Sequence, residues 1–424
     1  MRRYLTLMES NFPTELGTAF RSMENSSNPW AMSQGTRADW AKNLDIPIVD
    51  GTEAMSHEYL YWVGCAGSFD DKNQKVTQSM SKLMARADID FAILGPSELC
   101  TGDPARRSGN EYIFQMLAKQ NVETLDTLGV KKIITQCPHC FNTLKNEYPQ
   151  LGGNYEVVHH TQFLEWLIAE GKLDVSEATL EERIVYHDSC YLGRHNDVYL
   201  SPRNVIGSIK GVQIVEAGRN GTKGMCCGAG GARMWMEEDI GTKINDERSR
   251  ELIETGASRV ATACPFCYVM MDDGVKGHGN DTMVVADISM HVLEAIENGE
   301  AIAEAEADVI RQAVAAERAT AVSIATSTDT MVAQLLSTDT SELVLDDQAT
   351  EVAEAAVVID DLERINGIGP KYKAWLVGKG ITTFAQIAAL TQAEIDALEE
   401  EQSFTDRIDR EDWKGQAQAF LDEA

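Results

Sequence analysis

Between about residues 56 and 295, short apolar runs alternate with longer stretches in which apolar residues recur at helical spacing. The runs are rich in β-branched and aromatic residues: YLYWVG, FAILG and KKIITQ in the first half, then RIVYHDS, VQIVEAG and RVATA in the second. Helical stretches such as NEYIFQMLAKQNVETLDTLG and TQFLEWLIAEGKL follow the runs. This alternation predicts α/β units built on mostly parallel sheets.

The pattern changes on both sides of this region. Residues 1–55 contain an amphipathic helical stretch and then a break rich in Ser, Asn and Pro, which predicts an extension that packs on a neighbour. Residues 297–360 are rich in Ala, Thr, Val and Glu, and Arg311 and Arg318 are the only basic residues between 301 and 360. We expect an acidic linker there, partly helical near 300–320 and otherwise flexible.

Residues 361–424 regain a regular pattern. A G-I-G turn at Gly367 and Gly369 joins two short helical stretches, and a second turn at Gly378 and Gly380 precedes another pair. This layout predicts a helix-hairpin-helix. The chain as a whole is predicted to be α/β with two tandem Rossmann-like cysteine-rich domains. Its predicted parts are an N-terminal extension (1–55), a first cysteine-rich domain (56–175), a second one (176–296), the acidic linker (297–360) and a small all-α domain (361–424).

Nine cysteines fall into two series with nearly the same spacing. The first series reads C-x34-C-x36-C-x2-C and the second reads C-x35-C-C-x36-C-x2-C, which indicates a duplicated metal-binding or redox module. Most of them come at or just after the ends of predicted strands, where ligand sites of open α/β sheets gather. Helix N-termini at that edge favour negative charge such as a thiolate-bound cluster. The predicted metal ligands are Cys65, Cys100, Cys137 and Cys140 in the first series, and Cys190, Cys226, Cys227, Cys264 and Cys267 in the second.

The cysteine count narrows the chemistry. An odd number, two CxxC pairs and a length of 424 residues weigh against a disulfide framework and indicate a reducing, cytoplasmic setting. Four thiolates can hold a [4Fe–4S] cluster or a tetrahedral zinc ion. A closed zinc site has no use for a fifth thiolate, so the adjacent pair Cys226 and Cys227 favours a cluster with unusual iron geometry. Zinc and thiol-only sites remain alternatives.

The second series resembles the CCG cysteine-rich domain, whose signature is a cysteine, a Cys-Cys-Gly and a CxxC separated by gaps of thirty-odd residues. Here the signature is Cys190, Cys226-Cys227-Gly228 and Cys264-Pro265-Phe266-Cys267. This domain is found in heterodisulfide reductase catalytic subunits and in the iron–sulfur subunit of glycolate oxidase. The resemblance implies a noncubane [4Fe–4S] cluster on the five-cysteine set.

The first series departs from this signature. When the Ala-Arg pairs that follow are aligned, Cys100 lies opposite Cys227 and Leu99 occupies the place of Cys226. Four cysteines remain, which is enough for a cubane [4Fe–4S] cluster. We therefore expect two clusters, with a relay or structural role for the first and the chemistry at the second.

The flanking segments TGDPARRSGNEYIFQ, CYLGRHNDVY and CCGAGGARMWMEE resemble bacterial membrane-associated Fe–S oxidoreductases proposed to pass electrons from electron-transfer flavoprotein to quinone. The opening MRRYLTLMESNFP resembles the part of those proteins that follows a two-cluster ferredoxin domain. The resemblance implies ferredoxin-type or flavoprotein redox partners, a membrane-anchored subunit, and a cytoplasmic place at the inner face of the plasma membrane. The alternative enzyme is a heterodisulfide or thiol–disulfide reductase acting at the second cluster.

Polar residues around Cys190 are further candidates. His187, Arg194 and His195 either tune a nearby cluster and donate protons, or simply belong to a polar loop. We assign Cys226, Cys227, His187 and His195 to the candidate catalytic set.

Three glycines follow the adjacent cysteines. Gly228, Gly230 and Gly231 let the backbone approach the sulfurs and donate N–H groups, and with Arg194 they form the candidate cofactor-binding set. Four other residues are expected to be ordinary helix-start residues: His159, His160, Arg106 and Arg107.

The charge of the chain bears on its partners. A formal net charge of −30 repels phosphate backbones and anionic lipid, so no nucleic-acid partner is expected. No run of 18 apolar residues occurs, so we expect no transmembrane segment in this chain. The C-terminal domain carries Lys371, Lys373 and Lys379 near its turns but is expected to bind protein rather than DNA. The second alternative function, after the disulfide reductase, is a zinc-stabilised module that binds protein or DNA.

Overall fold

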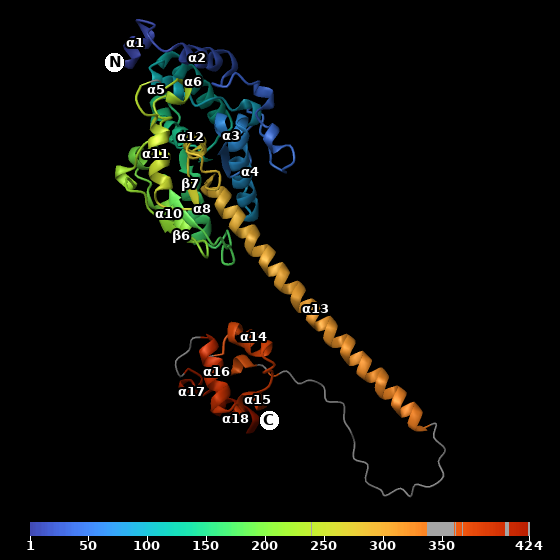
Figure 1. Cartoon of the computed structure of the whole chain (residues 1–424). Helices are drawn as coiled ribbons and strands as arrows, with labels where there is room; N and C mark the ends of the chain where they lie inside the picture. Colours follow the sequence, from blue (N-terminus) through green and yellow to red (C-terminus); the bar gives the residue numbers. More distant parts are fainter. Residues whose placement is uncertain (239, 337–359, 361, 367, 403–406, 423–424) are drawn as a thin grey trace, which may run out of the picture. The chain divides into compact units, whose positions relative to one another are not determined.

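The computed structural model describes residues 1–238, 240–336, 360, 362–366, 368–402 and 407–422. The chain divides into two compact units, Met1–Ala325 and Thr326–Ala424 (Figure 1). The first unit holds both cysteine-rich repeats, and the second holds the C-terminal helices.

The first repeat is built on a four-stranded parallel sheet. Its strands are β1 (Tyr59–Trp62), β2 (Phe91–Ala92), β3 (Lys132–Thr135) and β4 (Glu156–His159), in the order β2-β1-β3-β4. Leu60 pairs with Ala92 on one side and with Ile133 on the other. Parallel pairing requires crossovers, which the intervening helices supply. They are α3 (Gly64–Phe69), α4 (Asp71–Arg86), α5 (Asp103–Ser108), α6 (Glu111–Thr127) and α7 (Pro138–Asn142), and α8 (His160–Ala169) follows the last strand.

The second repeat has the same topology. Its strands are β5 (Arg183–Tyr186), β6 (Gln213–Val215), β7 (Arg259–Thr262) and β8 (Val284–Asp287), in the order β6-β5-β7-β8. Ile184 pairs with Ile214 on one side and with Arg259 on the other. The duplication inferred from the cysteines therefore extends to the sheets, and the predicted α/β parallel architecture is confirmed. The helices of this repeat are α9 (Gly193–Asn196), α10 (Leu200–Gly207), α11 (Ile244–Ile253) and α12 (Pro265–Gly277).

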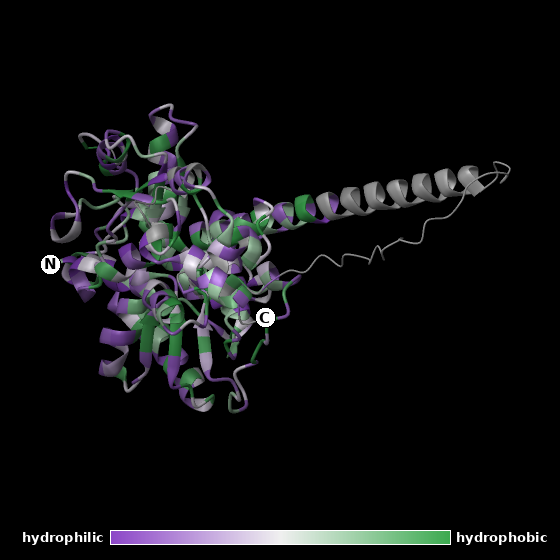
Figure 2. Ribbon diagram, turned by 90° about the horizontal axis from the view of Figure 1, so that it is seen from below, coloured by the Kyte–Doolittle hydropathy of each residue, from purple (hydrophilic) through white to green (hydrophobic). Residues whose placement is uncertain are grey.

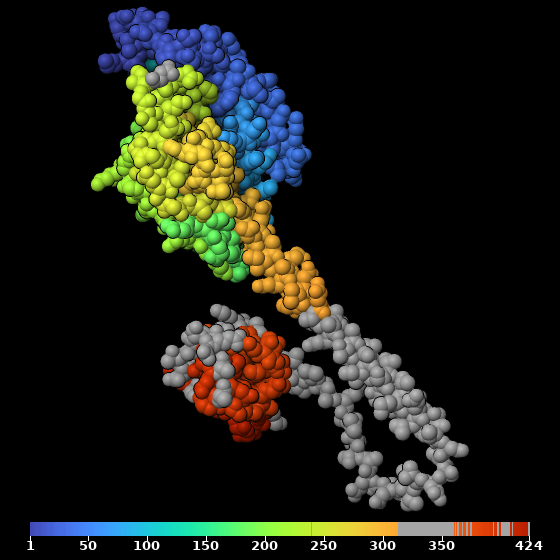
Figure 3. All heavy atoms as spheres, in the orientation of Figure 1, coloured from blue at the N-terminus to red at the C-terminus, as the bar shows by residue number. Residues whose placement is uncertain are grey.

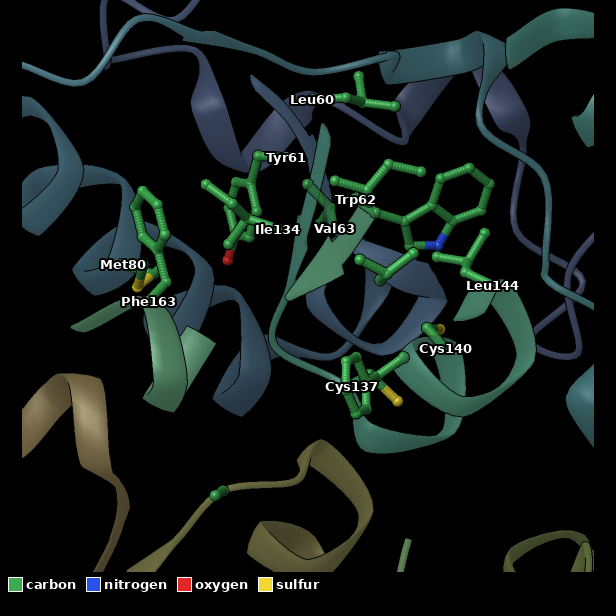
Figure 4. Packing of buried hydrophobic residues seen from close by; sticks show 14 of the residues in the cluster. Leu60, Tyr61, Trp62, Val63, Met80, Ile134, Cys137, Cys140, Leu144 and Phe163 are labelled. Atoms are coloured by element: carbon green, nitrogen blue, oxygen red, sulfur yellow. The ribbon is translucent and has the colours of Figure 1, made fainter. Parts of the chain in front are cut away.

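The hydrophobic cores of the two repeats form around strands that are buried on both faces of each sheet. Such strands read as nearly continuous apolar runs, and Figure 2 shows strands of the α/β region in the green of hydrophobic residues. Trp62 and Leu144 are completely buried in the first repeat, and Cys137 and Cys140 lie beside this core (Figure 4). The cysteines therefore sit where packed apolar side chains exclude water.

The N-terminal extension packs on both repeats, as its pattern predicts. It contains α1 (Arg2–Leu7) and α2 (Thr14–Ser26). The guanidinium of Arg2 donates to the carbonyl oxygen of Arg107 in the first repeat at 2.8 Å and to that of Gly231 in the second at 3.3 Å. On the face shown in Figure 3, the dark blue N-terminal segment lies against the yellow-green second repeat.

The helix that leaves the second repeat is longer than expected. The predicted helix near 300–320 is present, but it is part of a longer helix, because α13 runs over Ile288–Leu336. The segment contains no proline, and its many Ala and Glu residues have high helix propensity. Its first turns are anchored by the buried side chains of Val292 and Ile296. The remaining linker residues, 337–359, lie outside the described residues.

The C-terminal unit is a small helical domain with its own core. Trp413, Ile365 and Ile387 are completely buried there. Gly380 has a φ of +79°, a conformation that glycine adopts without strain. Gly367 of the G-I-G turn lies outside the described residues. The helices are α14 (Pro370–Gly378), α15 (Phe384–Ala388), α16 (Gln392–Gln402), α17 (Arg407–Arg410) and α18 (Trp413–Asp422).

Among the helices that the structure describes, none combines the length and apolar character of a membrane-spanning segment.

Candidate metal centre

The first cysteine series converges at the carboxyl edge of the first sheet. Cys65 lies in the first turn of α3 just after β1, and Cys100 follows β2. Cys137 and Cys140 flank the start of α7, where Pro138 occupies the first helical position that proline favours. All four thiols are buried and line one small cavity of about 30 Å³. The structure therefore brings the four predicted ligands of this set together.

A buried ion pair contacts Cys65 of this set, and no sequence motif predicted it. The guanidinium of Arg37 lies 2.5 Å from a carboxylate oxygen of Glu98 and donates to the Cys65 sulfur at 3.5 Å. Glu98 also accepts the backbone N–H groups of Val63 and Gly64. Burial raises the pKa of Cys65, but the hydrogen bond from Cys100 and the charge of Arg37 outweigh it and lower the pKa to about 7. A fixed cation thus favours the thiolate.

The second series gathers in the same way at the second sheet. Cys190 follows β5, the adjacent pair follows β6, and Cys264 and Cys267 flank the start of α12. The sulfurs of Cys267 and Cys227 are 3.4 Å apart. Cys190 and Cys226 are half-buried, whereas the other three thiols are buried. All five predicted ligands of this set therefore lie at one edge of the sheet.

Hydrogen bonds hold the pKa of the Cys226 thiol well below its usual value. The largest effect comes from Cys190, followed by Cys227 and then by the backbone N–H groups of Gly228 and Gly230. The N–H of Gly228 is 3.3 Å from this sulfur. Sulfurs this crowded keep several thiolates only with a compensating positive charge, which a metal centre provides.

The three glycines of the candidate cofactor-binding set differ in backbone conformation. Gly228 and Gly231 have φ values of +99° and +71°, where a side chain is strained. Gly230 has an ordinary φ, and a Cβ there would lie 3.7 Å from the Cys226 sulfur. The loop conformation therefore requires glycine at positions 228 and 231. At position 230, neither the backbone conformation nor the available space requires glycine.

His187 lies beside the second set. A ring nitrogen of His187 and the sulfurs of Cys227 and Cys267 are within 4.8 Å of one another. Its Nδ1 accepts a hydrogen bond of 3.1 Å from Nε of Arg248, so the neutral ring carries its proton on Nε2. Burial first, and the Arg248 charge second, lower the pKa of His187 to about 3. The neutral ring with a proton on Nε2 suits a hydrogen-bond donor rather than a metal ligand.

Arg194 and His195 lie farther out and are exposed. Arg194 donates to the carbonyl oxygen of Gly224 at 2.6 Å, so it holds the loop that leads to the adjacent cysteines. His195 stacks on Tyr191 with ring centroids 4.3 Å apart. Within the part of the chain that the structure describes, neither side chain has a recorded hydrogen bond to a cysteine sulfur. In this structure, Arg194 and His195 therefore contact the loops around the second set.

The two cysteine sets face each other across the boundary between the repeats. His139, inside the first CxxC turn, stacks on Tyr191 of the second repeat with ring centroids 4.0 Å apart. Phe266, inside the second CxxC turn, lines the cavity of the first set. The rings of His139 and Phe266 meet edge to face at 5.3 Å. Trp30 of the N-terminal extension stacks on Phe266 with ring centroids 6.4 Å apart and also lines the cavity.

Of the residues expected at helix starts, His159 and His160 are found there. The His159 side chain accepts the N–H of Thr161 and caps α8. Arg106 and Arg107 lie instead in the last turn of α5, where Arg107 pairs with Asp103 at 3.0 Å and Arg106 with Glu147 at 2.9 Å. His160 is also no ligand of the cysteine sets in this structure, because its Nε2 lies 2.9 Å from a carboxylate oxygen of Asp287.

Comparison with known proteins agrees with this architecture. Residues 59–145 and 184–272 match the cysteine-rich domain CCG. Residues 362–421 match the RS2/RL21/YNQ2 HHH domain. The predicted CCG and helix-hairpin-helix domains are therefore confirmed.

Curated relatives match the cysteine-rich region. The EtfAB:quinone oxidoreductase of Syntrophomonas wolfei is 43% identical over 311 residues, which is 70% of this chain and 43% of that protein. The probable iron-sulfur-binding oxidoreductase FadF of Bacillus subtilis is 44% identical over 65% of this chain and 40% of its own length. One subunit of the dihydromethanophenazine:CoB–CoM heterodisulfide reductase of Methanosarcina barkeri is 34% identical over 63% of this chain and 65% of its own length. The chain thus spans less than half the length of the first two relatives. Two segments of the chain thus match the cysteine-rich domain CCG, and the proteins to which the chain is similar include iron–sulfur and quinone-linked oxidoreductases and a heterodisulfide reductase subunit.

Proposed function

We propose that this chain is the iron–sulfur electron-transfer part of an oxidoreductase that links electron-transfer flavoprotein, or another dehydrogenase, to quinone. The observation that carries the proposal is the meeting of two cysteine sets, four thiols and five, at the carboxyl edges of two parallel sheets. The names of the relatives from Syntrophomonas wolfei and Bacillus subtilis support the same chemistry.

The donor sets fit iron–sulfur clusters. We assign a cubane-type [4Fe–4S] cluster to the four cysteines of the first repeat and a noncubane [4Fe–4S] cluster to the five cysteines of the second. We also propose that each repeat has a Rossmann-like fold. Iron–sulfur clusters exchange single electrons at potentials set by charge, hydrogen bonds and exposure. The protein supplies these three factors through the cation of Arg37, the N–H groups around Cys226 and the apolar walls at Val63 and Phe266.

Zinc suits these sets less well. Tetrahedral zinc takes four ligands, but the second set offers five sulfurs at one edge. His187 cannot complete such a site, because its Nδ1 is taken by Arg248 and its Nε2 carries the proton.

The partners follow from the same proposal. A redox partner of the flavoprotein or ferredoxin type delivers electrons, and a membrane-anchored subunit brings the chain to the inner face of the plasma membrane. A relative from Chromohalobacter salexigens is named a probable membrane-anchored ferredoxin, and it is 38% identical over 70% of this chain. The candidate catalytic residues remain Cys226 and Cys227 with His187, while His195 is a more distant candidate.

Heterodisulfide reduction at the second site is the second candidate. The five-cysteine set and the match to the Methanosarcina barkeri protein favour it. Turnover of disulfide substrates by the reduced protein would separate this activity from a flavoprotein-to-quinone relay.

The test is metal and sulfide analysis of anaerobically purified full-length chain, followed by EPR spectroscopy. We expect about eight iron and eight sulfide per chain and two distinct signals, as for two [4Fe–4S] clusters. Reduction by electron-transfer flavoprotein and reoxidation by a soluble quinone should then be observed. A colourless protein with stoichiometric zinc would overturn the proposal.

A further inference from the structure

Arg248 is a completely buried cation of the second repeat. It lies in the middle of α11, a helix that carries no cysteine. Its Nη1 lies 2.5 Å from a carboxylate oxygen of Glu251 and donates to the carbonyl oxygen of Arg219 at 3.0 Å. Two contacts on one edge of the guanidinium thus fix this side chain inside the repeat.

The guanidinium also holds the imidazole of His187, which is completely buried. Nε of Arg248 donates to Nδ1 of His187 at 3.1 Å. The backbone N–H of His187 donates to the carbonyl oxygen of Ala261, which continues the pairing of β5 with β7 beyond the end of β5. Because Nδ1 accepts, the neutral ring carries its proton on Nε2. Backbone and side chain of His187 are therefore both fixed at the edge of the sheet that carries the cysteines.

Two buried N–H groups of this pair have no hydrogen-bond partner in the part of the chain that the structure describes. They are Nε2 of His187 and Nη2 of Arg248. A buried donor left without an acceptor costs about 1–3 kcal/mol, so each such group calls for an acceptor bound beside it. A ring nitrogen of His187 and the sulfurs of Cys227 and Cys267 lie within 4.8 Å of one another. The second cysteine set is therefore next to the donor that lacks an acceptor.

The first site has a buried cation as well, in a different arrangement. Arg37 is paired with Glu98 and donates directly to the sulfur of Cys65 at 3.5 Å. In the second repeat, the buried arginine contacts the imidazole of His187 instead of a sulfur. Each cysteine set thus has one buried arginine near it, and only the second arginine acts on another side chain.

We propose that Arg248 is a positioning residue of the second site, which holds His187 in the tautomer and orientation whose Nε2–H donates a hydrogen bond to a sulfur of that site. The inference rests on the proposed function, because the accepting sulfur belongs to an iron–sulfur cluster or to one of its cysteine ligands. Hydrogen bonds to these sulfurs are among the factors that set the potential of a cluster. Partners that orient the groups around a metal change metal affinity or activity by about 10- to 100-fold when they are removed.

Three variants separate this role from simple packing. His187→Phe keeps an aromatic ring and removes the N–H donor. Arg248→Met keeps a long side chain and removes the group that fixes the tautomer. The control is Arg259→Met, because Arg259 is also buried and pairs with Glu294 at 2.7 Å, but it lies at the start of β7, away from the cysteines.

The experiment is electron-nuclear double resonance of the full-length chain, labelled with 15N-histidine and measured in H2O and in D2O. We expect the signal of the second site to show one exchangeable proton and one histidine nitrogen. Both couplings should be lost in His187→Phe and lost or shifted in Arg248→Met, because the ring is then free to turn or to change tautomer. Arg259→Met should keep both couplings, and the signal of the first site should stay unchanged in all three variants.

The outcomes separate the two proposals. If iron and sulfide are absent from the wild-type chain, the proposed function fails, and 15N NMR of its histidines still shows whether His187 carries its proton on Nε2. If both clusters assemble and the couplings survive in His187→Phe, the hydrogen bond is wrong. If the couplings are lost in His187→Phe but unchanged in Arg248→Met, only the positioning role is wrong.

A variant that fails to load the second cluster is decided by the same NMR measurement. Without that cluster, the ring nitrogens of His187 report the tautomer directly in Arg248→Met. A mixture of tautomers supports the positioning role of Arg248, and the single tautomer of the wild-type chain contradicts it.

Discussion

Arg37 and Glu98 form a buried ion pair whose cation also donates to the sulfur of Cys65. The pair thus links the N-terminal extension to Cys65, a predicted ligand of the first site that lies 28 residues after Arg37 in the chain. A positive charge held this close favours the reduced, more negative state of a cluster at that site.

Removal of this charge should lower the potential of the first site. We expect Arg37→Gln to lower it by about 60 mV, since a hydrogen bond to a charged group is worth about 1.5 kcal/mol and a tenfold change in a one-electron equilibrium is about 59 mV. Redox titration monitored by EPR measures the shift. Because Arg37→Gln leaves Glu98 buried without its partner, the double variant Arg37→Gln/Glu98→Gln controls for folding. An unchanged potential in both variants contradicts the assignment.

Substitution of single cysteines should separate the two sites. We expect Cys227→Ser to alter the EPR signal of the oxidised second site and to leave the first signal intact. Cys100→Ser, at the corresponding position of the first repeat, should do the reverse. Spectra that respond to both variants alike would show that the sulfurs do not form two separate sets.

Gly228 and Gly230 form a matched pair for testing the loop. We expect Gly228→Ala to destabilise the second repeat by about 1–3 kcal/mol, because alanine is strained at a φ of +99° and its Cβ would lie 3.2 Å from Met270. Gly230→Ala should be tolerated, since its backbone is ordinary and its nearest neighbour is 3.7 Å away. Urea unfolding and iron content measure both. Equal losses in the two variants would exclude the conformational explanation.

His291 should give the protein an acid-sensitive stability. It is completely buried, and burial first, then the Arg259 charge, lower its pKa to about 4. The unfolded chain therefore binds a proton at higher pH than the folded one. The contribution of the neutral His291 to the free energy of unfolding is complete above pH about 6.5. It is lost as the pH falls toward 4, which lowers the free energy of unfolding by up to about 3 kcal/mol.

The pH dependence of urea unfolding tests this contribution. Between pH 6.5 and 4, His291→Asn should lose less stability than the wild-type chain loses. Parallel curves for the two proteins would show that His291 does not titrate in this way.

Opening the first cavity should expose its contents to oxidants. Trp30 of the N-terminal extension lines this cavity, so we expect Trp30→Ala to widen it and to speed the loss of iron from the first site in air. Trp166→Ala is the control, because Trp166 lies on the outer surface of α8. Bleaching of the first-site absorbance measures the rate, and equal rates in both variants would rule out a protective role.

The sequence predicts what repeats along the chain. Spacing identifies the nine cysteines, and apolar runs identify the strands that place them at one edge of each sheet. The contacts of Arg37 and Arg248 could not be predicted in this way. Arg37 contacts Cys65 and Arg248 contacts His187, each from a segment that carries no cysteine. His139 differs, since a polar residue inside a CxxC turn is a visible signal. What it touches depends on how the two repeats pack, which local pattern does not encode.

The exchange of side chains between the two CxxC turns has a consequence for the origin and engineering of this protein. Each repeat places a side chain against the other: Phe266 lines the first cavity, and His139 packs on Tyr191 of the second repeat. The copies are therefore no longer interchangeable units. A single repeat expressed alone, or two copies of the same repeat joined in tandem, would present an incomplete site to its own cofactor.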